Sequence, residues 1–162
     1  MGTRNHNLPE KLKRNTKAHR IRENKKNLGR SIEERPKEVE NRQEFGHWKA
    51  DLVVGQKSGN DQVLLTLVER KSREYWMLPI KNRHADSVME AFKALQKTYS
   101  EHFGQVFKTI TTDNGSEFSR LSELEELAET LVFYTHPYTS CEKGTNERHN
   151  GIIRRFIPKG KR

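Results

Sequence analysis

The chain has 162 residues, of which 31% are hydrophobic, and its 31 Lys and Arg outnumber 22 Asp and Glu to give a formal net charge of +9. This length predicts one core domain, and no apolar run approaches the roughly 18–20 residues that a membrane helix needs. The single cysteine, Cys141, excludes an internal disulfide and a zinc site built from several cysteines. We therefore expect a soluble, cytoplasmic protein without a membrane partner.

The positive charge is concentrated at the two ends of the chain. Residues 1–30 hold 10 basic and 2 acidic residues and residues 143–162 hold 7 basic and 1 acidic, whereas residues 31–142 carry a net charge of −5. Basic ends around an acidic middle favour a polyanionic partner, although charge can also serve solubility alone. Residues 1–44 contain few apolar side chains and no sustained period, so they are expected to form a flexible basic arm or linker.

A folded core is expected over residues 45–162, because regular apolar patterns begin at Phe45. The expected elements, in chain order, are strands over 48–54, 62–69 and 75–80, a helix over 85–100, a strand over 108–112, a helical stripe from 121, a strand over 131–134, and a helix over 145–157. This order predicts an α/β fold in which helices flank a mixed five-stranded sheet.

Two aspartates occupy positions that call for an explanation. Asp51 interrupts an apolar strand, where a charge is costly unless it is paired or binds a metal; the alternative is an edge strand on which Asp51 faces solvent. Asp113 follows the strand over 108–112 and opens the sequence Asp113-Asn-Gly115. That sequence is an ordinary turn, but the carboxyl end of a strand is also where open α/β sheets place their sites.

A third acid, Glu147, lies on the helix expected over 145–157. Helical spacing places it on one face with Asn150 and Arg154, around Gly151, and an apolar face lies opposite. The members of that apolar face are Ile152, Ile153 and Phe156. A solvated surface helix would give the same pattern. Together with Asp51 and Asp113, however, Glu147 could complete an oxygen-only cluster of the kind that Mg²⁺ or Mn²⁺ prefers, and two such ions support displacement at a phosphodiester.

Three motifs in this order resemble the catalytic core of bacterial insertion-sequence transposases of the IS-thirty family, within the integrase-like DDE group. They are Gly46-His-Trp-Lys-Ala-Asp51, Thr112-Asp-Asn-Gly-Ser-Glu-Phe118 and Glu142-Lys-Gly-Thr-Asn-Glu-Arg-His-Asn-Gly151, closing on Phe156-Ile-Pro-Lys-Gly160. The resemblance spans about residues 32–160 and implies a ribonuclease-H-like fold. It also implies that Asp51, Asp113 and Glu147 are the catalytic residues and the ligands of two Mg²⁺ or Mn²⁺ ions.

The resemblance further implies DNA transposition: hydrolysis at transposon ends, then strand transfer into target DNA, with a homo-oligomer in the active complex. Candidate contacts with DNA are Lys143, Arg148, Asn150, Arg154, Arg155 and Asn114, with a solvated helix face as the alternative for the basic residues. Two other readings stay open, namely an inactive core that binds DNA without catalysis and a ribonuclease-H-like nuclease.

The sequence departs from the family pattern at two motif positions and at both ends. Lys49 stands where the family usually has an acidic residue, and Cys141 stands where a Trp is usual. The family also has an N-terminal helix-turn-helix region and a further C-terminal stretch, neither of which is matched, so we expect a truncated core. Glu117 could orient Asn114 or pair with a basic neighbour.

Overall fold

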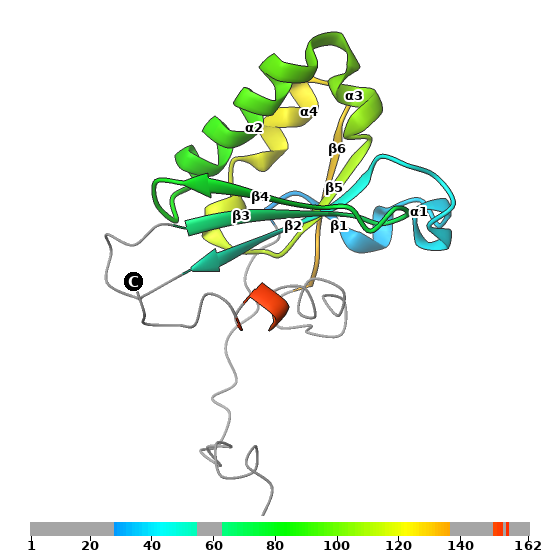
Figure 1. The fold of residues 1–162 in the computed structure, drawn as a ribbon. Helices are drawn as coiled ribbons and strands as arrows, with labels where there is room; N and C mark the ends of the chain where they lie inside the picture. Colours follow the sequence, from blue (N-terminus) through cyan, green and yellow to red (C-terminus); the bar gives the residue numbers. More distant parts are fainter. Residues whose placement is uncertain (1–27, 55–62, 137–150, 154, 156–162) are drawn as a thin grey trace, which may run out of the picture.

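A computed structural model describes residues 28–54, 63–136, 151–153 and 155 (Figure 1). Their framework is a six-stranded sheet with the order β1-β6-β5-β2-β3-β4. The strands are β1 (Arg30–Ser31), β2 (His47–Val54), β3 (Val63–Glu69), β4 (Tyr75–Ile80), β5 (Thr109–Thr112) and β6 (Leu131–Tyr134). No helix in the described ranges combines the length and the apolar character needed to cross a bilayer.

Strand β2 joins the two halves of the sheet. It pairs antiparallel with β3, which pairs antiparallel with β4. On its other side β2 pairs parallel with β5, and β5 and β6 continue the parallel half. Because β2 has a neighbour on both sides, Asp51 lies on an interior strand, and the edge-strand alternative for this residue is wrong.

The side chains of β2 alternate between two faces of the sheet, as the pleat of a strand requires. Trp48 and Ala50 are buried in the hydrophobic core, and Leu52 and Val54 pack against it. Lys49 and Asp51 occupy intervening positions and therefore belong to the opposite face.

The core face is covered by helices, as Figure 1 shows for α2, α3 and α4. The helices and 3₁₀ turns are η2 (Ile32–Glu34), α1 (Glu38–Asn41), α2 (Ala85–Tyr99), η3 (Ser100–His102), α3 (Phe103–Val106), η4 (Ser116–Phe118), η5 (Leu121–Glu123) and α4 (Leu124–Leu127). Helix α2 buries Val88, Met89 and Phe92, which recur at helical spacing and form one apolar stripe. Trp48 anchors this layer, because its indole Nε1 donates to the carbonyl of Val106 at 2.7 Å.

Most predicted elements of the core are present, and the main difference lies at the N-terminal side. The sixth strand, β1, comes from residues that the sequence analysis assigned to the basic arm, and it pairs parallel with β6. The expected apolar stripe from 121 is divided into a 3₁₀ turn and one turn of α-helix. Residues 1–27, which make up most of the expected arm, lie outside the described residues.

The helix expected over 145–157 is described only at residues 151–153 and 155, which are helical and lie on the side of the sheet opposite α2 (Figure 1). Ile153 is buried, whereas Ile152 is 48% exposed. The expectation that both residues belong to one docked face is therefore wrong for Ile152. The side chains of consecutive helical residues point about 100° apart around the helix axis, so Ile153 can be buried while Ile152 stays exposed.

The turn between β3 and β4 is organised by one buried carboxylate, Glu69. Its Oε2 accepts the backbone N–H groups of Lys71 and Ser72 at 2.8 and 2.6 Å, together with the Ser72 hydroxyl at 2.8 Å. Its Oε1 accepts the N–H of Gly46 at 3.2 Å. Burial alone raises the pKa of Glu69, but these donors, led by Ser72, outweigh it and hold the pKa below its ordinary value. The ionised form thus stabilises the turn.

Glu69→Gln should lower the free energy of unfolding by about 2 kcal/mol at pH 7, because the amide NH₂ cannot accept from these donors. A carboxyl with a lowered folded-state pKa stabilises the fold above its unfolded pKa and loses that contribution as pH falls through the folded value. Urea denaturation should therefore show wild type losing more stability than Glu69→Gln between about pH 5 and pH 3. Parallel pH profiles would contradict this role.

Candidate active site

Asp51 is held on the sheet face opposite the hydrophobic core. Its Oδ1 accepts the N–H of Leu52 at 2.8 Å, and its backbone carbonyl accepts the Thr66 hydroxyl at 3.0 Å. The pKa of nearby Tyr75 is raised, mainly because the side chain is buried. A hydrogen bond with Thr66 lowers this pKa, and the negative charge of Asp51 raises it. The negative charge of Asp51 therefore acts on Tyr75, which lies on the same face.

Asp113 follows β5 directly and is aligned with Asp51 by the strand register. The parallel pairing joins His47 to Thr109 and Lys49 to Thr111, a constant offset of 62 residues. The same offset carried two residues further matches position 51 with position 113. Asp113 therefore follows the carboxyl end of β5, beside the part of β2 that carries Asp51, and the carboxyl ends of parallel strands are where α/β sheets place ligand sites.

A second carboxylate, Glu117, lies close to Asp113 across Gly115. A Cβ atom at Gly115 would lie 2.7 Å from Oε2 of Glu117 and 2.9 Å from Oδ1 of Asp113, so these oxygens are at most 5.6 Å apart, the two distances end to end. A side chain at position 115 would require the side-chain ends of both acids to move. Asp113 Oδ1 also accepts the N–H of Gly115 at 3.2 Å, so the turn and the acids are held together.

Glu117 is compensated by Arg83. The carboxylate is 5% exposed, and its Oε1 accepts from Nη2 and Nε of Arg83 at 2.8 and 3.1 Å. Of the two roles open for Glu117 from the sequence, the structure shows the pairing with a basic neighbour. Asn114 instead accepts the N–H of Leu28 on its Oδ1 at 3.0 Å, which ties the first described segment to the loop after β5.

The remaining predicted site residues are covered only in part. Glu147, the third expected acid, and four expected DNA contacts lie outside the described residues; these contacts are Lys143, Arg148, Asn150 and Arg154. Arg155 is exposed on the helical turn. No group of three or more His, Cys, Asp or Glu able to hold a metal occurs among the residues that are described.

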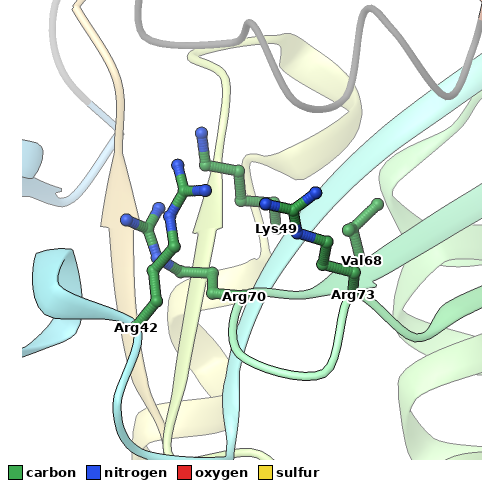
Figure 2. A pocket seen from close by; sticks show the side chains of 5 residues that line it. All are labelled: Arg42, Lys49, Val68, Arg70 and Arg73. Carbon is green, nitrogen blue, oxygen red and sulfur yellow. The ribbon is translucent and has the colours of Figure 1, made fainter.

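A basic concavity on the same sheet face was missed by the sequence reasoning. It is lined by Arg42, Lys49, Val68, Arg70 and Arg73 (Figure 2). Arg70 and Arg73 lie in the polar stretch between the strands predicted over 62–69 and 75–80. These two arginines were the available signal, but their convergence with Arg42 and Lys49 depends on the fold.

Comparison with known proteins gives one consistent result. Residues 41–140 match the model of the integrase core domain family. The chain is 42% identical over 153 residues to a probable transposase for insertion-like sequence element IS1161 of Streptococcus salivarius, covering 94% of this chain and 42% of that protein. It is 35% identical to a transposase for insertion sequence element IS4351 of Bacteroides fragilis, over 84% of this chain and 42% of that protein. The chain thus spans about two fifths of the length of these curated relatives.

Solved structures agree on the fold. The HTLV-2 integrase catalytic core domain in complex with magnesium superposes with a TM-score of 0.50 and 20% identity, over 69% of this chain and 68% of that one. A chain of the simian T-cell lymphotropic virus intasome in complex with PP2A regulatory subunit B56 gamma superposes with a TM-score of 0.53 and 21% identity, over 69% of this chain and 39% of that one. The expected ribonuclease-H-like α/β fold is confirmed.

Arg83→Gln should lower the free energy of unfolding by about 1–2 kcal/mol, because it leaves the buried Glu117 carboxylate without its charged donor. Adding Glu117→Gln should cost less in this background than in wild type, a coupling of about 1 kcal/mol in a double-mutant cycle. Urea denaturation gives all four values. Lys81→Gln, which removes a cation exposed to solvent and 3.8 Å from Glu90, is the control and should change stability by less than about 0.5 kcal/mol. Additive effects of Arg83→Gln and Glu117→Gln would contradict the pairing.

Proposed function

This chain belongs to the integrase core domain family, and on that premise we propose that it is the catalytic core of a DDE transposase. The proposed activity is a polynucleotidyl transfer, in which phosphodiester bonds are cut at transposon ends and the freed 3′ end is joined to target DNA. The observation that supports the proposal is the register of β2 and β5, which pairs Lys49 with Thr111, each two residues before a predicted catalytic aspartate. The transposase relatives support DNA as the substrate.

We propose Asp51, Asp113 and Glu147 as the catalytic triad and as ligands of two Mg²⁺ or Mn²⁺ ions. Carboxylate oxygens are the donors that these cations prefer, and a related fold carries magnesium. Glu147 rests on motif order and spacing alone. Bound divalent ions supply activation of water and neutralise the charge that develops on a phosphodiester under attack.

The protein's own contribution is to hold its acids in place before substrate arrives. Asp51 is fixed by an interior strand, and its carboxylate is oriented by the N–H of Leu52. The loop that carries Asp113 is braced by the Arg83–Glu117 ion pair and by the small Gly115. If these acids converge as proposed, their mutual repulsion gives the site affinity for cations.

DNA is the proposed partner, as transposon ends and as target, with further copies of the chain in the active complex. Asn114 and Arg155 are the proposed DNA contacts among the described residues; the others are Lys143, Arg148, Asn150 and Arg154. Electrostatic contacts of this type give affinity without reading sequence.

Mn²⁺ should raise the melting temperature of the wild-type chain, because a ligand of the folded state stabilises it by mass action. Asp51→Asn should remove most of this shift. Glu126→Gln, which neutralises an exposed acid on α4, is the matched control and should keep the full shift. Equal Mn²⁺ shifts in wild type and Asp51→Asn, measured by thermal denaturation, would refute the metal site.

Glu147→Gln should abolish metal-dependent cleavage of a transposon-end duplex while leaving the melting temperature unchanged. Glu142→Gln should keep measurable cleavage, because Glu142 precedes Gly144 and is expected before or at the start of the helix, where a carboxylate adds at most about 1 kcal/mol of stability. Gel analysis of the cleavage products measures both. If Glu142→Gln were inactive and Glu147→Gln active, the assignment of the third acid would be wrong.

A further inference from the structure

The basic concavity brings together four cationic side chains from separate parts of the chain. Arg42 follows α1, Lys49 lies on β2, and Arg70 and Arg73 belong to the turn after β3. Figure 2 shows their charged ends gathered over the sheet, with Val68 as the apolar part of the lining. Four positive charges repel one another, so the fold must hold these side chains together despite the repulsion.

Two of these arginines also have an unfavourable backbone conformation. Arg42 and Arg73 have φ angles of 54° and 61°, and they are two of the three non-glycine residues with positive φ in the described part of the chain. This left-handed region suits Gly and Asn and is costly for most other residues. Strained residues that cluster at one place point to a functional constraint on their side chains.

The acids near the concavity are already engaged. Glu69 accepts from the turn, as described above, and Glu40 pairs with Nη2 of Arg35 at 3.4 Å. Among the described residues, neither Arg42 nor Arg73 forms an ion pair with a carboxylate. Burial and then the positive charges of Arg35 and Arg42 lower the pKa of Arg70 to about 10, against the raising effect of Glu40 and Glu69.

Arg35 has a buried hydrogen-bond donor without an acceptor in the described part of the chain. Its side chain is 95% buried beside the concavity, and its Nη1 donates to the hydroxyl of Thr111 at 3.1 Å, opposite Lys49 in the sheet. Its Nε has no hydrogen-bond acceptor among the described residues. A buried donor without an acceptor is unfavourable.

The concavity lies next to the predicted catalytic acids. Lys49 precedes Asp51 by two positions on β2, so the two residues share one face at about 7 Å along the strand. Lys49 is also paired with Val68 and Thr111 on the neighbouring strands. A polyanion that reached Asp51 would therefore pass beside these cations.

We propose that Arg42, Lys49, Arg70 and Arg73 form a binding site for a backbone phosphate of DNA, which holds the strand beside Asp51. The choice of DNA as the source of the phosphate rests on the proposed function. The site binds by charge and shape, and it positions the strand without reading its sequence.

The test measures DNA binding in EDTA, where no metal-dependent cleavage takes place, so that failure of the proposed catalysis leaves the readout intact. Fluorescence anisotropy follows binding of the 162-residue chain to two labelled duplexes of unrelated sequence over a series of KCl concentrations. The variants are Arg42→Asn, Arg73→Asn and their combination. Lys97→Gln removes one exposed positive charge from α2, on the far side of the sheet, and is the control.

Each arginine variant should weaken binding severalfold and equally on both duplexes, and should reduce the slope of log affinity against log salt by about 0.9, the value for one lost phosphate contact. The combined variant should weaken binding further but lose no more slope than about 0.9, because the site holds one phosphate. Lys97→Gln should leave the slope unchanged. Unchanged affinity and slope in the arginine variants, with wild type binding DNA, would overturn this site alone. Wild type that binds no DNA would overturn the proposed function as well.

A thermal melt separates a ligand-binding role from a structural one. Since Asn tolerates the left-handed conformation, Arg42→Asn and Arg73→Asn should melt at or above the wild-type temperature. Loss of affinity that accompanies a clear fall in melting temperature would assign the arginines to the fold and overturn the proposal. A rise in the wild-type melting temperature with inorganic phosphate that requires Arg42 and Arg73, while substitution of these arginines leaves DNA binding unaffected, would overturn DNA as the ligand.

Discussion

The two-residue alternation of β2 is the constraint on which the rest of the structure depends. Trp48 and Ala50 enter the core, and Lys49 and Asp51 are thereby committed to the other face. A shift of one residue in register would bury a lysine and an aspartate and expose the tryptophan. The ring centroid of Trp48 lies 4.5 Å from that of Trp76 and 5.1 Å from that of Phe107. The burial of Trp48 among these rings therefore fixes the position of the predicted catalytic acid Asp51.

The core of the fold could be predicted from the sequence because its signals are local. The β4 and β6 boundaries match the expected ranges, and α2 begins at the expected residue, since period-2 and period-3.6 patterns are visible within each segment. Strand β1 could not be predicted in this way. It has only two residues, Arg30–Ser31, and exists through its pairing with β6, about a hundred residues later.

In the candidate active site, too, only the features with a local signal could be predicted from the sequence. Asp51 and Asp113 could be proposed because a charge at an apolar position and an acid after a strand are visible in the sequence. The partners of Glu117 could not be chosen, because Arg83 reaches it across 34 residues. The basic concavity was missed for a related reason: Arg42, Lys49 and Arg70 come from three segments. Lys49 departs from the family motif, and its proposed role in binding phosphate follows only from its position beside Arg42, Arg70 and Arg73.

The two outer strands of the sheet have a consequence for assembly. At one edge β1 offers only two residues, and at the other β4 carries Pro79, which has no N–H to donate. Short edge strands and edge prolines are the devices by which proteins prevent sheets of different copies from joining side by side. Additional copies of this chain would therefore meet through helices, loops or sheet faces, and the backbone ladder would end within each molecule.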